Sequence, residues 1–222
     1  MSYDFPQYGN LNISSLSSIF NNTSASYKYI FFLSILNLIH ENPNKREFSY
    51  IDIEVEMIYL GWFPHTYYKL SFGLNDKLGN TIDLIGDIDI KNSTNRDIKS
   101  YIKSKIDPLK STLLDMVPYR LLSVFVNNKD INKTSNKEVI NWANSLKDSP
   151  SSLYYFKQSK ESKKENSIIL SEPWLRYIKD NFKIIKDYAT YNFLGYMEKR
   201  NPNVLNLSTK LFPPSNESRN LT

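Results

Sequence analysis

The run "YIFFLSILNLI" at residues 29–39 constrains the fold most, because eleven residues that are nearly all apolar must be removed from water. A membrane-spanning helix needs about twenty such residues, and Lys28, Asn37 and His40 flank or interrupt this run. Its apolar side chains occupy more than one face of a helix, which is typical of a helix at the centre of a globular core. The sequence therefore predicts a core helix at residues 27–41 and no membrane span.

Apolar residues at helical spacing predict most of the remaining elements. Residues 50–64 are ambiguous, because "FSYIDIEV" also alternates like a strand, and we favour a helix that ends near Gly61–Pro64. Further helices are expected at residues 95–106, at 136–146 after a cap at Ser135 or Asn136, and at 172–200. Two short runs, "LYYF" and "SIILS", flank a charged turn. The predicted fold class is mainly α, a helical domain with a small β-hairpin at roughly residues 153–170 and irregular amino- and carboxyl-terminal ends.

The expected domain organisation is simple. A chain of 222 residues is long enough for one sizeable core, and no internal repeat is visible. Residues 1–200 are therefore expected to form a single, mostly helical domain. Residues 201–222 are rich in proline and asparagine, which predicts a linker, because proline ends helices and lacks a backbone donor.

The composition excludes several kinds of chemistry. Without cysteine, the chain can form neither disulfides nor thiolate metal sites. His40 and His65 are the only histidines, no His-x-x-x-His pair occurs, and the six glycines never cluster into a phosphate-binding loop. We therefore expect no catalytic residue, no metal and no cofactor in this chain. The start "MSYDFPQYGN" lacks the basic and apolar regions of a secretory signal, which predicts a cytoplasmic location.

Charge is distributed unevenly along the chain. Residues 1–100 hold 8 Lys and Arg against 11 Asp and Glu, whereas residues 101–222 hold 20 against 12. Such asymmetry accompanies binding to nucleic acid or to a membrane surface. Lysine far outnumbers arginine, however, and arginine is the better reader of phosphates and bases. Charge alone therefore favours a merely solvated surface over a nucleic-acid surface.

One carboxylate cluster resembles part of a metal site. The stretch "DLIGDIDIK" contains Asp83, Asp87, Asp89 and Lys91. In Mg²⁺-dependent nucleases of the PD-(D/E)xK type, two carboxylates hold the metal and a lysine orients the attacking water. Asp89 and Lys91 match the second half of that motif, but "DIK" recurs eight residues later in a predicted helix. The cluster is therefore a weak alternative, and a solvated turn is the simpler interpretation.

Three segments place a lysine or arginine beside aromatic or amide side chains: "NTSASYKY", "VPYRLLSVF" and "EKRNPNV". Guanidinium and amide groups supply many contacts to phosphates and base edges. Taken singly, each segment is more often a helix start or a turn. The segments become informative only when they are considered together.

Together with other stretches, they resemble the amino-terminal region of bacterial HNH endonuclease domain-containing proteins. The polar residues of "NTSASYKY", "PYRLLS" and "KRNPNV" are the most specific, because core packing does not dictate them. The resemblance covers nearly the whole chain through five stretches in order: "IFNNTSASYKYIFFLSILNLI", "MIYLGWFPHTYYKLSFGLNDKL", "VPYRLLSVF", the surroundings of Tyr154 and Trp174, and "YMEKRNPNVLNLSTKLFPP".

The resemblance implies a helical region ahead of a nuclease module in which histidine and asparagine on a ββα element hold one divalent metal. No His…Asn…His arrangement occurs in this sequence, so that module would follow residue 222 and would hold the metal. This chain would then be the non-catalytic region that positions DNA or a partner for phosphodiester hydrolysis. The expected contacts are Lys28, Tyr119, Arg120, Lys199, Arg200 and Asn203.

Two other functions remain open. A stand-alone protein-interaction module without enzymatic activity predicts a protein partner in place of DNA and a large exposed apolar patch. A PD-(D/E)xK-like nuclease requires the carboxylates of "DLIGDIDIK" to lie together. Two of the expected contacts also have a purely local interpretation: Arg120 can pair with a buried carboxylate, and Asn203 can shape the turn after Pro202.

Overall fold

The computed structural model describes residues 5–21, 23–74, 76–88, 93–106, 111–126, 135–160 and 165–213. These residues form a mainly helical fold with one small antiparallel sheet, as the sequence predicts. The helices are α1 (Ile13–Ser17), α2 (Tyr27–Glu41), α3 (Tyr50–Thr66), α4 (Leu78–Ile85), α5 (Asn95–Ile106), α6 (Val117–Leu121), the 3-10 helix η1 (Leu122–Val124), α7 (Asn136–Ser145), α8 (Glu172–Asp180), α9 (Phe182–Arg200) and α10 (Leu207–Leu211).

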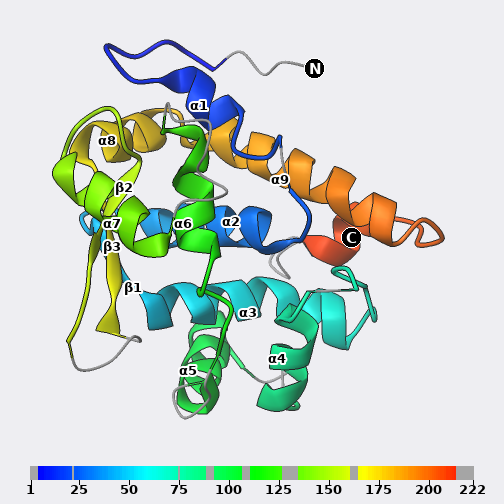
Figure 1. Cartoon of the computed structure of the whole chain (residues 1–222). Coiled ribbons are helices and arrows are strands. Elements are labelled where there is room, and N and C mark those ends of the chain that lie inside the picture. Colours follow the sequence, from blue (N-terminus) through cyan, green and yellow to red (C-terminus); the bar gives the residue numbers. More distant parts are fainter. Residues whose placement is uncertain are drawn as a thin grey trace.

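Helix α2 lies at the centre of the molecule. It is sandwiched between α9 on one side and α3 on the other, and α4 and α5 cover the far side of α3 (Figure 1). Every residue from Tyr29 to Leu36 is buried, and Ser34, the one serine in that stretch, donates its hydroxyl to the Ile30 carbonyl at 2.8 Å. The predicted core helix is therefore confirmed, because contacts on several sides remove its apolar surface from water.

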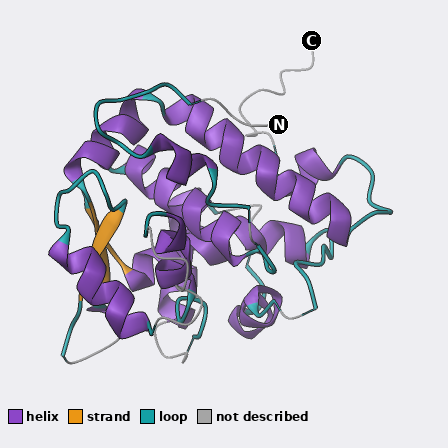
Figure 2. Ribbon diagram, turned by 45° about the horizontal axis from the view of Figure 1, so that its top comes forward, coloured by secondary structure: helices purple, strands orange, loops and turns teal. Residues whose placement is uncertain are grey.

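The sheet lies at one end of the helical layers (Figure 2). Strands β2 (Tyr154–Lys157) and β3 (Ser167–Leu170) form the predicted hairpin, and β1 (Glu47–Ser49) adds to the other edge of β3. The ambiguous segment is thus divided, with a three-residue strand followed by the favoured helix. Ser49 ends the strand and caps α3, because its hydroxyl accepts from the Asp52 N–H at 3.2 Å.

The described part of the amino-terminal segment packs against α8 and α9. The Tyr177 hydroxyl donates to the Pro6 carbonyl at 2.9 Å, and the Tyr188 hydroxyl donates to the Ser17 carbonyl at 2.7 Å. Apart from α1, this segment is irregular, as predicted.

The carboxyl-terminal segment begins with the loop after α9. Within it, α10 packs on α3 and α9, and its Leu207 and Leu211 are buried. The described portion of the expected linker is therefore part of the hydrophobic core. Residues 214–222 lie outside the described residues. Among the helices of the described ranges, none combines the length and the apolar composition needed to cross a membrane.

Candidate functional site

The first turn of α2 is fixed by a carboxylate from the loop before α4. The Ser26 N–H donates to Asp76 Oδ2 at 3.0 Å, and the Ser26 hydroxyl donates to the same oxygen. The other carboxylate oxygen accepts from the Leu78 N–H at 3.0 Å, and the Tyr27 hydroxyl accepts from the Lys77 N–H. Burial raises the pKa of Asp76, against the opposing effect of its hydrogen bonds. A carboxylate at a helix amino end is favoured by the helix dipole, so this contact positions the segment "NTSASYKY".

Two expected contacts, Lys28 on α2 and Arg120 on α6, lie close enough to influence each other. Burial lowers the pKa of the half-buried Lys28 ammonium group, and the positive charge of Arg120 lowers it further. Arg120 itself is exposed, so it does not serve a buried carboxylate. Two cations held together favour an anion between or above them, because the anion interacts with both charges.

Tyr119 does not lie on this surface. Its side chain is buried, its hydroxyl accepts from the Tyr50 hydroxyl at 3.2 Å, and its ring lies 5.2 Å from that of Phe156. The residue therefore joins α6 to the core, and we drop it from the expected contacts.

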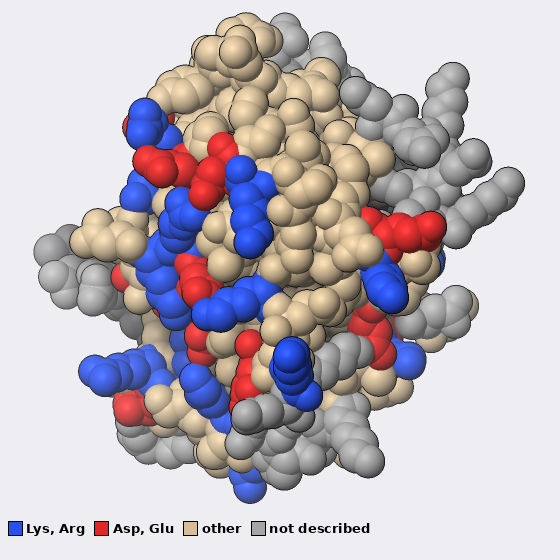
Figure 3. Space-filling view, turned by 60° about the vertical axis from the view of Figure 1, so that its left-hand side comes forward, with Lys and Arg blue, Asp and Glu red and all other residues tan. Residues whose placement is uncertain are grey.

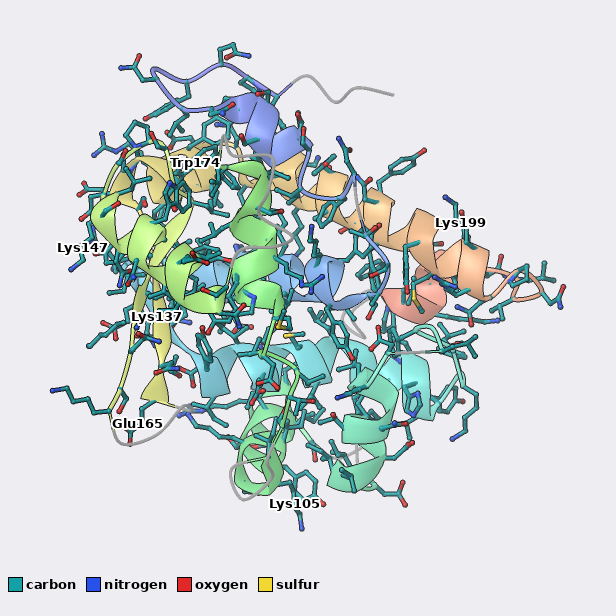
Figure 4. The ribbon with its side chains drawn as sticks, in the orientation of Figure 1. Lys105, Lys137, Lys147, Glu165, Trp174 and Lys199 are labelled. Carbon is teal, nitrogen blue, oxygen red and sulfur yellow. The ribbon has the colours of Figure 1, made fainter. Side chains whose placement is uncertain are left out.

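The carboxyl end of α9 presents two exposed cations, Lys199 (Figure 4) and Arg200. The Arg200 guanidinium lies over the Tyr196 ring, 5.3 Å from its centre, and the Tyr196 hydroxyl donates to the Phe72 carbonyl at 2.7 Å. The Tyr196 ring also lies 5.2 Å from that of Tyr29, which is the residue after Lys28. Ring contacts thus connect this end of α9 directly to the first turn of α2.

Asn201 fixes the loop at residues 71–73 beside these rings. Its Oδ1 accepts from the Ser71 N–H at 2.8 Å, and its Nδ2 donates to the carbonyls of Ser71 at 3.0 Å and Met197 at 2.9 Å. Gly73 is needed in this loop, because it has a φ of +125° and a Cβ there would lie 3.0 Å from the Tyr196 hydroxyl oxygen. Asn203 is exposed in the turn that follows Pro202.

A groove with a volume of about 640 Å³ separates the segment before α2 from the second half of α9. One wall includes Phe20, Asn21, Thr23 and Tyr29, and the other wall is the face of α9 that carries Tyr191, Asn192, Gly195, Tyr196, Glu198, Lys199 and Arg200. Polar and apolar groups both line it, and it is open to solvent. Its size falls within the range of about 300–1,000 Å³ that is usual for small-molecule sites.

Four of the six expected contacts form two pairs near the amino end of α2: Lys28 with Arg120, and Lys199 with Arg200 in the groove that Tyr29 lines. They come from three segments that are far apart in the sequence. The sequence analysis missed Asp76 and Asn201, which tie the first turn of α2 and the end of α9, respectively, to the segment at residues 71–78 through hydrogen bonds. Long-range pairing of this kind leaves no local signal in the sequence.

The sheet end of the molecule carries charges of both signs close together. Figure 3 shows Lys and Arg on this side with Asp and Glu placed among them. Arg46 lies 2.9 Å from Asp148, and Lys157 lies 2.9 Å from Glu47. Exposed pairs of this kind compensate each other locally, so this end offers less attraction to a polyanion.

The carboxylates of "DLIGDIDIK" do not form a metal site in the described residues. Asp83 lies on α4 instead of a strand, is exposed, and has Oδ1 2.9 Å from His65 Nε2. Asp87 is exposed after the helix, and Asp89 and Lys91 lie outside the described residues. Among the residues that are described, no group of three or more His, Asp or Glu side chains could hold a metal ion.

A second charged cluster lies in another groove, of about 710 Å³, between α2, α3 and α5. Lys99 Nζ lies 2.6 Å from Glu56 Oε2 and 2.6 Å from Glu41 Oε1, and Asn37 donates to Glu56 Oε1 at 2.8 Å. Burial raises the pKa of Glu56, whose side chain is 1% exposed, against the opposing effect of Lys99. Burial disfavours the charge of Lys99, yet the two carboxylates raise its pKa overall.

This cluster explains the second "DIK" segment in structural terms. Asp97 helps Thr94 to cap α5: the Thr94 hydroxyl accepts from the Asp97 N–H at 3.2 Å, and the Asp97 carboxylate accepts from the Thr94 N–H at 2.9 Å. Lys99 neutralises the buried Glu56 and so connects α5 to α3. The motif therefore contributes to the fold.

Comparisons with protein-family models, with curated proteins and with solved structures found no match. The resemblance to the HNH endonuclease family thus remains a prediction from the quoted segments, and the function has to be inferred from the site itself.

Proposed function

We propose that this protein binds DNA through the surface around the amino end of α2, and that it is the non-catalytic region of an HNH-type endonuclease. The observation that carries the proposal is spatial. Lys28 of "NTSASYKY" lies near Arg120 of "PYRLLS", and the next residue, Tyr29, contacts the Tyr196 ring, over which Arg200 of "KRNPNV" lies.

The chemistry of this surface suits a phosphate backbone. Cations that neutralise phosphates release condensed counterions, and this supplies much of the affinity of DNA-binding proteins. Helix α2 is well buried, and the buried Tyr196 and Met197 anchor the last turns of α9, so these elements would hold the cations in fixed positions. In this proposal, phosphodiester hydrolysis and the divalent metal belong to an HNH module outside this sequence, and the chain positions the DNA.

The test is the salt dependence of binding to a fluorescently labelled DNA duplex. The quadruple variant Lys28→Met, Arg120→Gln, Lys199→Gln, Arg200→Gln should bind more weakly than the wild type. It should also lower the slope of log K against log salt by about 3–4, at about 0.9 per lost phosphate contact.

The matched control removes the same charge from the sheet end through glutamine substitutions at Lys147, Lys157, Arg176 and Lys179. This control should change the slope much less, because its cations lie away from the proposed surface. If wild-type protein fails to bind duplex DNA even at about 50 mM salt, where phosphate contacts are strong, the proposal is wrong. The protein-interaction module would then become the leading hypothesis.

A further inference from the structure

Gly195 is the one glycine in the described helices that the packing of the chain does not explain. A Cβ at Gly61 of α3 would lie 2.7 Å from Leu78 Cδ2, and a Cβ at Gly79 of α4 would lie 2.8 Å from His65 Cε1. Both glycines therefore permit close packing between elements. At Gly195, in the second half of α9, a Cβ would meet no atom within 4 Å, and φ is not positive.

Glycine in a helix interior is less stable than alanine, so the residue weakens α9 without relieving any contact within the described structure. Its open side faces the 640 Å³ groove. Glycine at such a place allows a ligand to approach the helix backbone closely. A ligand in the groove would explain the glycine at position 195.

The face of α9 around Gly195 carries groups that suit a nucleotide. Tyr191, Gly195 and Lys199 are spaced by four residues, which places them in one row along the helix. The Tyr191 side chain is 58% exposed, and Lys199 and Arg200 are exposed at the far end of the row. An aromatic ring, an open stretch of backbone and two cations therefore follow one another along the groove.

The remaining groups in the groove fit the same ligand. Asn192 donates through Nδ2 to the Tyr188 carbonyl at 2.8 Å, which leaves its carbonyl oxygen to accept from a base edge. Asn21 adds a second amide from the opposite wall, whereas the carboxylate of Glu198, next to Lys199 in sequence, partly offsets the attraction of the two cations for a phosphate. Amides that read base edges, together with aromatic rings and cations, are the groups that recognise unpaired nucleotides.

We propose that the groove binds one unpaired nucleotide of DNA, with its base against Tyr191, its sugar against Gly195 and its phosphate beside Lys199 and Arg200. This inference rests on the proposed DNA-binding function and adds to it a preference for single-stranded or locally opened DNA. Duplex DNA would contact the cations but would leave the groove empty.

The experiment compares the binding of a labelled single strand and of a duplex of the same length by the wild type and three variants. Wild-type protein should prefer the single strand. Tyr191→Ala should weaken single-strand binding by about 5- to 150-fold, the loss expected for one stacked base. Tyr67→Ala, at a tyrosine that is 68% exposed outside the groove, should leave it unchanged.

Gly195→Ala gives the sharper result, because stability and binding should change in opposite directions. Its Tm should rise by about 1–4 °C, since alanine favours the helix. Its affinity for the single strand should nevertheless fall by at least about 5-fold, because the added methyl group occupies the space of the ligand. Duplex binding should be unchanged.

The outcomes separate the two proposals. Duplex binding that depends on salt and on Lys28 and Arg120, without any preference for the single strand, overturns the nucleotide groove and retains the DNA-binding function. A Gly195→Ala variant that is stabilised but binds the single strand as well as wild type also overturns the groove. Tighter binding to RNA than to DNA of the same sequence overturns the assignment of DNA. Absence of binding to any strand overturns both proposals.

Discussion

Replacement of Lys99 by methionine should destabilise the protein in a manner that depends on pH. Methionine can retain part of the aliphatic packing of Lys99, whose ammonium group lies 4.9 Å from the centre of the Tyr59 ring, but removes that group. Glu56, whose side chain is 1% exposed, then loses the cation that lies 2.6 Å from its Oε2. The variant must therefore either bury an unpaired carboxylate or protonate it.

The loss of stability is set by whichever of these two routes costs less free energy. Leaving a buried carboxylate without its cation costs about 3–5 kcal/mol. Protonating Glu56 instead costs about 1.36 kcal/mol for each pH unit above the ordinary pKa of 4.5. That amounts to about 3.4 kcal/mol at pH 7 and about 0.7 kcal/mol at pH 5. The free energy of unfolding should thus fall by about 3 kcal/mol at pH 7 and by less than about 1 kcal/mol at pH 5.

The sign follows from proton binding. Burial raises the pKa of Glu56 in the folded protein, and loss of Lys99 raises it further. Between 4.5 and this raised pKa, the folded variant binds more protons than the unfolded chain, so its stability falls as the pH rises. The loss of stability should therefore develop between pH 5 and pH 7.

The assay is urea unfolding at pH 5, 6 and 7, followed by the fluorescence of the buried Trp174 (Figure 4) and the two other tryptophans. Lys103→Met is the matched control. Lys103 lies 2.9 Å from Asp52 but is 54% exposed, so its loss should cost less than about 1 kcal/mol and show little dependence on pH.

The double variant Glu56→Gln, Lys99→Met separates charge from packing. Glutamine removes the carboxylate, so the double variant should recover much of the stability lost at pH 7 and lose its pH dependence. A loss for Lys99→Met that is equal at pH 5 and pH 7 would refute the electrostatic reasoning and would assign the effect to packing of the lysine stem.

Two further predictions concern stability. Asn201→Ala should lower the free energy of unfolding, measured with urea, by about 2–4 kcal/mol, because it removes three hydrogen bonds of a buried amide. Replacement of the exposed Asn203 by alanine should change it by less than about 0.5 kcal/mol. Equal effects of the two substitutions would contradict the structural role of Asn201. Gly61→Ala should lower the Tm, unlike Gly195→Ala, because the added methyl group meets the fully buried Leu78. A rise in the Tm of Gly61→Ala would show that Leu78 can move aside.

Local patterns in the sequence predict the elements whose causes are themselves local. The core helix follows from its continuous apolar residues. Helix α7 follows from Ser135, whose hydroxyl accepts from the Glu138 N–H at 3.3 Å in a complete capping box. The hairpin follows from two apolar runs on either side of a charged turn. In each case, residues close together in sequence determine the structure.

Features that depend on distant partners were not predictable in this way. Strand β1 has only three residues and exists because Phe48 pairs with Ile168, 120 positions away. Tyr119 belongs to a segment that the resemblance selects, yet Tyr50 and Phe156 enclose it. The isolated Gly195 was the one local signal that could have directed attention to the groove, because a helix interior disfavours glycine.

The central position of α2 also has a consequence for how the protein is made. Its neighbour α9 begins about 140 residues after α2 ends, which corresponds to roughly 7–28 s of synthesis at 5–20 residues per second. For that time, the buried central helix lacks one of its two covering layers, and β1 lacks its partner strand. Collapsed intermediates with exposed apolar surface are prone to aggregate, so this protein is expected to depend on chaperones during translation more than a bundle whose neighbouring helices are consecutive in sequence.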